Sequence, residues 1–170
     1  MIYYITGGER SGKSRYAQKL AESLSPSPYY LATARIWDED FQQRVDRHQA
    51  DRDERWTSIE EDKFISQLDL NGKTVVIDCV TLWLTNWFMD LNQNIEHCLK
   101  ASKQELQILF EQDTTLIIIS NEIGMGIHAS THVGRKFTEL QGWINQYIGE
   151  NAQQATLMVS GMPLTLKAIQ

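Results

Sequence analysis

The residues best suited to chemistry stand near the start of the chain, in the stretch GGERSGKS at residues 7–14. It fits the pattern G-x-x-x-x-G-K-[ST], in which glycines let backbone N–H groups turn toward an anion and the next helix adds its positive dipole end. In this pattern Lys13 would reach the β and γ phosphates of a nucleotide, and Ser14 would hold Mg²⁺. The alternative is a glycine-rich turn with a surface lysine, but the apolar run IYYIT before the stretch supplies the strand that the motif requires.

We therefore expect a nucleoside triphosphate or a close relative to bind at this loop. The residues of the expected site, called the phosphate loop below, are Gly7, Gly8, Glu9, Arg10, Ser11, Gly12, Lys13 and Ser14.

A second magnesium ligand should be an acid at the end of another buried strand. Asp78 closes the apolar run TVVID and meets that description, although it could also be a simple strand-end cap. Together these residues predict a P-loop nucleotide enzyme, but they do not say which group is transferred.

A histidine among arginines is the second candidate for chemistry. On a helix His48 would share the face of Val45, and Arg44 and Arg52 would flank it at helical spacing. Guanidinium groups suit the oxygens of an oligophosphate, and they would tend to keep the imidazole neutral and available as a nucleophile. Two other interpretations remain open, a satisfied core histidine and a solvated helix whose arginines are matched by acids.

The elements that must position these residues follow from short apolar runs. The runs lie at residues 2–6, 29–33, 74–78, 116–120 and 156–160. They do not alternate apolar with polar residues, which is typical of strands buried on both faces of a parallel sheet. Stripes at helical spacing lie between them, at residues 16–24, 64–68, 95–109 and 137–148.

This alternation predicts one α/β domain over residues 1–170. We expect a single P-loop NTPase domain, with a doubly wound, mostly parallel sheet flanked by helices.

The stretch TLWLTNWFMDL, residues 81–91, carries more apolar bulk on one helical face than a half-exposed helix normally does. A core helix packed on the sheet is the favoured interpretation. A subunit interface or the wall of a pocket for a large apolar ligand is the alternative.

Composition narrows the classes of function. The formal net charge of −6 argues against a general nucleic-acid binder. Cys79 and Cys98 form no CxxC pattern, so we expect buried thiols and neither a disulfide framework nor a zinc site. No apolar run approaches the length of a membrane span and no targeting segment is evident, so we expect a cytoplasmic protein.

Several stretches together resemble one family, the bifunctional adenosylcobinamide kinase/adenosylcobinamide-phosphate guanylyltransferases of cobalamin biosynthesis. In chain order they are TGGERSGKS, YYLATA, RVDRHQADR, WTSIE, VVIDCVTLWLTNWF, ISNEIGMGI, GRKF and VSGMPLTLK. The resemblance covers nearly the whole chain, and the histidine segment and SNEIGMG are its most specific parts.

The resemblance implies two reactions. ATP or GTP would phosphorylate the aminopropanol hydroxyl of adenosylcobinamide, and GMP from GTP would then be transferred onto that phosphate, giving adenosylcobinamide-GDP and pyrophosphate. It implies that the GMP is first carried on His48. The remaining residues that it implies for the GTP site are Thr33, Ala34, Arg35, Gln49, Ala50, Asp51, Arg52, Glu60 and Asp78.

Some implications of the resemblance leave alternatives open. Glu60 could equally be a plain surface acid. Asn121 and Glu122, in SNEIGMG, would help to receive the corrinoid, or could form a tight turn with an exposed acid. The family usually continues with a Pro-Glu pair where this chain reads IHASTHVGRKF, and we expect His128 and His132 to be simple loop residues.

The family is often homo-oligomeric and commonly trimeric, so the resemblance also implies a homo-oligomer, which the apolar residues 81–91 would suit. Two functional alternatives remain open beside the two-step enzyme. One is a simple P-loop small-molecule kinase, which has no use for a nucleophilic histidine. The other is a nucleotide-binding switch without turnover.

Overall fold

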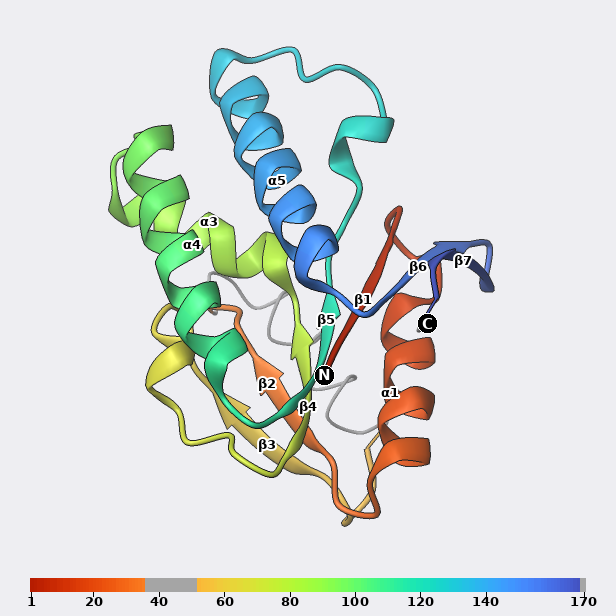
Figure 1. Ribbon diagram of the computed structural model, residues 1–170. Coiled ribbons are helices and arrows are strands. Elements are labelled where there is room, and N and C mark those ends of the chain that lie inside the picture. Colours follow the sequence, from red (N-terminus) through yellow and green to blue (C-terminus); the bar gives the residue numbers. More distant parts are fainter. Residues whose placement is uncertain (36–51, 169–170) are drawn as a thin grey trace.

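The short apolar runs of the sequence form the strands of one sheet in the computed structural model, which describes residues 1–35 and 52–168. The strands are β1 (Ile2–Gly7), β2 (Tyr29–Ala32), β3 (Thr57–Glu60), β4 (Thr74–Asp78), β5 (Thr115–Ile119), β6 (Gln154–Val159) and β7 (Met162–Lys167). Their order in the sheet is β3-β2-β4-β5-β1-β6-β7. All neighbouring pairs are parallel except β6 and β7, which form an antiparallel hairpin at one edge (Figure 1).

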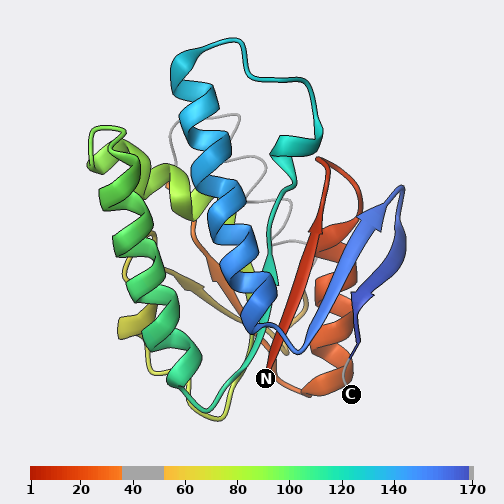
Figure 2. The same cartoon turned by 45° about the horizontal axis from the view of Figure 1, so that its top comes forward.

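Helices cover both faces of this sheet. The helices are α1 (Lys13–Leu24), α3 (Val80–Asp90), α4 (Ile95–Glu111) and α5 (His132–Asn151), with short 3₁₀ turns η1 (Ile65–Gln67) and η2 (Ile123–Met125). Helix α1 packs on one face, and α3, α4 and α5 pack on the other (Figures 1 and 2). The mostly parallel, doubly wound sheet predicted from the sequence is therefore confirmed.

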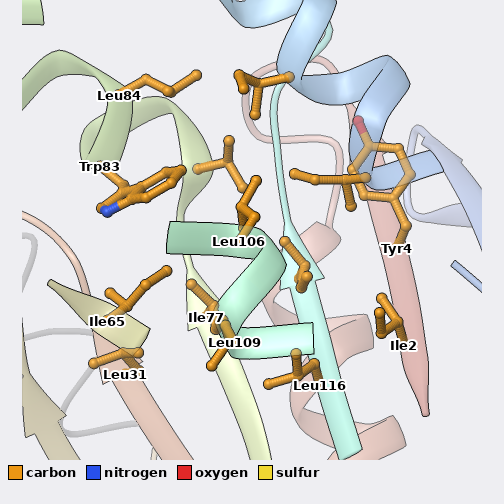
Figure 3. Packing of buried hydrophobic residues seen from close by; sticks show 14 of the residues in the cluster. Ile2, Tyr4, Leu31, Ile65, Ile77, Trp83, Leu84, Leu106, Leu109 and Leu116 are labelled. Carbon is orange, nitrogen blue, oxygen red and sulfur yellow. The ribbon is translucent and has the colours of Figure 1, made fainter. Parts of the chain in front are cut away.

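Alternation along the strands divides the core into two layers. In β4, Val75 and Ile77 point toward the layer of α3, α4 and α5, whereas Val76 points toward α1, and all three are almost fully buried. Figure 3 shows Leu106 of α4 and Trp83 of α3 among the apolar side chains of the larger layer. A strand with a helix layer on each face must be apolar throughout, which explains the continuous runs in the sequence.

The apolar helix at residues 80–90 belongs to this core. Trp83, Leu84 and Phe88 are 1%, 0% and 3% exposed, and the indole N–H of Trp83 donates a 2.9 Å hydrogen bond to the carbonyl of Lys63. The interpretation as a core helix is confirmed, and these three side chains are not available for a subunit interface.

The two edge strands were not predicted from the sequence. Strand β3 has only one half-buried residue, Ile59, and every residue of β7 is exposed, so neither shows a buried apolar run. The stripe at residues 64–68 predicted a helix, but only the single turn η1 forms there. Cys79 and Cys98 are buried free thiols, as expected. Within residues 1–35 and 52–168, no helix combines the length and the apolar character that crossing a membrane requires.

Candidate active site

The phosphate loop joins the inner strand β1 to α1 and is tightly packed against the β6–β7 turn. Gly7 and Gly12 have φ values of 150° and 97°. A Cβ atom at Gly7 would lie 2.5 Å from the carbonyl oxygen of Met158, and one at Gly12 would lie 3.2 Å from the Cα of Gly161. Both positions therefore need glycine, for backbone conformation and for space.

Lys13 is the buried cation of the loop. Its ammonium donates to the carbonyls of Gly7, at 3.1 Å, and Gly8, and lies 3.4 Å from Ser11 Oγ. Burial lowers the pKa of Lys13, because water no longer solvates the charge. Neutral carbonyls compensate that loss only in part, so the oxygens of a phosphate would be better partners for this ammonium.

The two predicted magnesium ligands meet, although 64 positions separate them in the chain. The hydroxyl of Ser14 donates to Asp78 Oδ2 at 2.9 Å. The phenol of Tyr30, in the neighbouring strand, donates to the same oxygen at 2.9 Å. Burial, reinforced by the negative charge of Asp78, raises the pKa of Tyr30, so the phenol remains a donor.

This pair of oxygens fits Mg²⁺. The ion prefers hard oxygen ligands and is commonly bound by one or two carboxylates together with phosphate oxygens and water. The hydroxyl of Ser14 and the carboxylate of Asp78, beside the phosphate loop, would be the protein's ligands in such a set. No cluster of three or more His, Cys, Asp or Glu side chains with metal-binding geometry occurs among the described residues.

Arg52 supplies a second cation, from the start of the segment that leads to β3. Its guanidinium stacks on the Tyr30 ring, with Cζ 3.7 Å from the ring centroid, and its Nη2 lies 3.5 Å from Ser58 Oγ. Its Nε and Nη1 are buried and find no hydrogen-bond acceptor in the described parts of the chain. Buried donors of this kind are costly to leave unpaired, and an anion would satisfy both of them.

These groups surround two adjoining cavities at the carboxyl ends of the parallel strands. One has a volume of about 370 Å³, and its walls include Gly8, Tyr30, Ala34, Arg52, Glu60, Asp78, Asn121 and Glu122. The other, of about 1140 Å³, lies over the phosphate loop, and its walls include Arg10, Lys13, Ser14, Lys19, Asp78 and Asn121. Asp78 and Asn121 line both cavities, so the two adjoin at the end of β4 and β5, where α/β sheets bind their ligands. We call the two cavities together the cleft.

Thr33 supports the cleft and is not among the residues that line it. The residue is fully buried, and its hydroxyl donates a 2.8 Å hydrogen bond to the carbonyl of Cys79. Its own carbonyl accepts a 2.8 Å hydrogen bond from Asn86 Nδ2 of α3. These contacts fix the end of β2 to β4 and α3, and Ala34, one residue further on, forms part of the wall.

The guanidinium of Arg35 forms ion pairs with two carboxylates, those of Asp62 and Asp90. It donates to both carboxylate oxygens of Asp90, at 2.7 and 2.8 Å, and to Asp62. Lys63 also pairs with Asp90. The resemblance implied that Arg35 contributes to the GTP site, whereas in the structure its guanidinium is engaged in this ion-pair cluster.

Four expected residues, His48, Gln49, Ala50 and Asp51, lie outside the described residues. Arg52 follows them directly and lies in the cleft. Glu60 lines the cleft and is exposed at the end of β3.

Glu122 differs from the exposed acid of the tight-turn alternative. It is half-buried and lines the cleft, and its Oε1 accepts hydrogen bonds from Thr6 Oγ1, Asn145 Nδ2 and Tyr4 OH at 2.8, 3.1 and 3.3 Å. His128 is exposed in the loop, as expected. His132 is also exposed but is the first residue of α5, and was wrongly expected to be a loop residue.

Reasoning from the sequence missed Tyr30, Thr6 and Asn145 as functional side chains. Tyr30 and Thr6 lie inside apolar runs that predicted only core strands. The available signals were the hydroxyl of Thr6 at the carboxyl end of its run and the phenol of Tyr30 within its own run. Asn145 lies on the inward face of α5, where a buried amide needs hydrogen-bond partners, and that is the only hint the sequence offers.

Comparison with known proteins shows the family of this chain. The family model described as cobinamide kinase / cobinamide phosphate guanyltransferase matches residues 3–166. The chain is 34% identical over 168 residues to the bifunctional adenosylcobalamin biosynthesis protein CobP of Pseudomonas aeruginosa, covering 96% of this chain and 95% of that protein. It is 31% identical over 182 residues to the bifunctional adenosylcobalamin biosynthesis protein CobU of Escherichia coli, covering 98% of this chain and 100% of that protein.

Among solved structures, the flagellar accessory protein FlaH from Methanocaldococcus jannaschii is similar to this chain with a TM-score of 0.47 and 14% identity. The similarity covers 98% of this chain and 78% of that protein.

Proposed function

The chain belongs to the cobinamide kinase / cobinamide phosphate guanyltransferase family, and on that premise we propose that it catalyses two successive transfers in one cleft. In the first, the γ phosphate of ATP or GTP moves to the hydroxyl of adenosylcobinamide. In the second, GMP from GTP moves to the phosphate made in the first, with release of pyrophosphate.

The observation that supports this proposal most strongly is the half-buried guanidinium of Arg52, in which two donor atoms are buried. Its Nε and Nη1 have no acceptor in the described residues, and it lies in the same cavity as Asp78. Two guanidinium N–H groups without an acceptor among the described residues, in a cavity that Asp78 also lines, suit an oligophosphate that runs from the loop toward Arg52.

In the kinase step, the phosphate loop holds the β and γ phosphates with its backbone N–H groups and Lys13. Ser14 and Asp78 would hold Mg²⁺, which when bound neutralises charge on the phosphates. The acceptor's hydroxyl oxygen forms a bond to the γ phosphorus while the bond to the β–γ bridging oxygen breaks, and the nucleoside diphosphate leaves.

In the nucleotidyl step, an imidazole nitrogen of His48 attacks the α phosphorus of GTP, and pyrophosphate leaves. An oxygen of cobinamide phosphate then attacks the same phosphorus and frees His48. Covalent catalysis of this kind divides one difficult displacement into two easier ones. Arg52, four residues from His48, would stabilise the charge on the transferring phosphate. Gln49, Ala50, Asp51 and Glu60 would contribute to binding of the nucleoside part.

Labelling with GTP radioactive at the α phosphorus tests the nucleotidyl step. Wild type should acquire an acid-labile, alkali-stable label on the protein, and His48→Ala should acquire none. His97→Ala is the matched control, because His97 is exposed at the first turn of α4. Label that persists in His48→Ala, or that never forms while γ phosphate is transferred, would refute the covalent step, and the second result would favour a simple kinase.

The cytoplasmic location and the homo-oligomer, with a trimer as the candidate form, remain predictions. The need for ATP and GTP favours a cytoplasmic location. The exposed apolar side chains of β7, Met162, Leu164 and Leu166, offer a surface for an oligomer.

A further inference from the structure

The carboxylate of Glu122 is fixed in place beside the phosphate loop. Its backbone N–H donates a 3.2 Å hydrogen bond to the carbonyl of Gly7, the first residue of that loop. Its Oε1 accepts from Thr6 and Tyr4 of β1 and from Asn145 of α5. One oxygen of the carboxylate is thus fully occupied by three donors from two elements.

A buried polar network on α5 supports this arrangement. Asn145 Oδ1 accepts a 2.7 Å hydrogen bond from Ser120 Oγ, and Asn145 Nδ2 donates to the carbonyl of Asn121 as well as to Glu122. Gln141 Nε2 donates to Ser120 Oγ at 2.7 Å. Ser120, Gln141 and Asn145 are 0%, 1% and 7% exposed, so the network is held inside the protein and ends at the carboxylate of Glu122.

The second oxygen of Glu122 has a different environment. No described residue donates a hydrogen bond to Oε2, and Glu122 lines the 370 Å³ cavity together with Gly8 and Asp78. A negative oxygen is a poor neighbour for phosphate oxygens, because like charges repel. The natural partner for Oε2 in this cleft is therefore a donor on the acceptor substrate, such as a hydroxyl.

The other carboxylates of the cleft are less suited to that task. Asp78 already accepts from Ser14 and Tyr30 and would hold Mg²⁺. Glu60 ends β3, which β2, β4 and β5 separate from the phosphate-loop strand. Glu9 is exposed at the tip of the loop. Glu122 follows β5, the direct neighbour of β1, and is the carboxylate that a network holds against the loop.

We propose that Glu122 is the general base of the kinase step. As the acceptor's oxygen attacks the γ phosphorus, the hydroxyl proton moves to Oε2 of Glu122, and the electron pair of the broken bond leaves on the nucleoside diphosphate. Thr6, Tyr4 and Asn145 are positioning residues for this carboxylate. The role rests on the kinase activity proposed above.

Guanylylation of the protein in the nucleotidyl step serves as an internal control for this proposal, because it should not need a general base. Its nucleophiles are a neutral imidazole nitrogen and an oxygen of a phosphate that is already ionised, so neither must lose a proton as it attacks. Loss of the base should therefore slow the kinase step and leave guanylylation of the protein intact.

Glu122→Gln is the decisive variant, because the amide oxygen can keep the contacts of Oε1 while the base is lost. We expect its kcat for γ-phosphate transfer to cobinamide to fall about 100-fold or more, with the KM for nucleotide little changed. Labelling of the protein by GTP radioactive at the α phosphorus should continue at the wild-type rate, which would also show that the variant folds. The matched control is Glu139→Gln, an exposed position on α5, which should keep both activities.

An unchanged kinase kcat in Glu122→Gln would overturn the proposal, and so would an equal fall in both reactions, since that would indicate a structural role. A wild-type protein that transfers neither γ phosphate nor GMP would refute the proposed function and the base role with it. A wild type that labels itself with GMP but transfers no γ phosphate to cobinamide would remove the base role alone.

Discussion

Arg52 shows how one residue can reveal a ligand. Its guanidinium stacks on Tyr30, and two of its donor atoms are buried and have no acceptor among the described residues. A lysine would keep the charge but lose both the planar stack on Tyr30 and the capacity for a bidentate hydrogen bond to phosphate oxygens.

We therefore predict that Arg52→Lys slows labelling of the protein by GTP about 10-fold or more, the loss expected when a charge-assisted hydrogen bond of about 1.5–3 kcal/mol is removed. The measurement is the rate of label incorporation from GTP radioactive at the α phosphorus. Arg55→Lys is the control, because Arg55 is exposed three residues away and pairs only with Asp53 and Glu22 among the described residues. Equal rates in wild type and Arg52→Lys would show that Arg52 does not contact the nucleotide.

Asp90, at the end of α3, forms ion pairs with Arg35, which follows β2, and with Lys63. Hydrogen bonds from Arg35 and Lys63 hold the pKa of Asp90 far below its ordinary value of 3.8. A carboxyl with a lowered pKa in the folded state stabilises the fold above its unfolded pKa, and the stabilisation is lost as pH falls through the folded value.

Asp90→Asn should thus lower the free energy of unfolding at pH 7 by about 1 kcal/mol or less, since the cluster is near the surface and is screened by solvent. The difference from wild type should narrow progressively below about pH 4, where the unfolded state begins to bind the proton. Urea unfolding of both proteins across this range measures it, with Asp113→Asn as an exposed control. A difference that does not change with pH would contradict the role of charge.

At the residue scale, the sequence predicted those candidate site residues that belong to a local motif or end an apolar run. The phosphate loop and Asp78 are examples, because spacing and strand ends identify them. The hydrogen bonds that join Glu122 to Thr6 and Asn145 span 116 and 23 positions. No local pattern encodes such a contact, so only the folded chain shows that the carboxylate is held in place.

At the scale of elements, the apolar side chains of α3 differ in burial, which a count of apolar residues in the sequence does not show. Leu84 is fully buried in the larger layer of the core, whereas Met89 in the same helix is 50% exposed. If α3 were an interface helix, its apolar face would be exposed in the single chain and would be covered only by another subunit.

Leu84→Ala should therefore lower the free energy of unfolding by about 2–5 kcal/mol, because it leaves a cavity in the core. Met89→Ala, the control on the same helix, should change it by about 0.5 kcal/mol at most. Denaturant unfolding measures both. A Leu84→Ala variant of normal stability that changes only the oligomeric state would contradict the placement of α3 in the core.

The elements that the sequence predicted are those with a helix layer on each side. Strands β1, β4 and β5 show continuous apolar runs because both faces are buried. Strands β3 and β7 form through backbone hydrogen bonds to a neighbour at each edge of the sheet, and exposed edge strands carry no apolar signature. Their pairing is decided by tertiary contacts, which single-sequence patterns do not contain.

At the scale of the whole molecule, the parallel sheet explains why residues far apart in the chain share one cleft. The carboxyl ends of β1, β4 and β5 lie at one end of the sheet, together with the phosphate loop, Asp78 and Glu122. The phenol of Tyr30 reaches Asp78 there from β2. The fold class could be predicted from the sequence for this reason, whereas the division of roles between Glu122 and the other carboxylates could not.

The most direct test of the account is to follow both phosphorus atoms of GTP into the final product. Two parallel reactions with adenosylcobinamide, Mg²⁺ and GTP as the sole nucleotide would contain GTP radioactive at either the α or the γ phosphorus. If both transfers occur in this protein, the cobinamide product carries the α label and the γ label in equal amounts, and pyrophosphate is released. A product that carries only the γ label, or no label at all, would contradict the account.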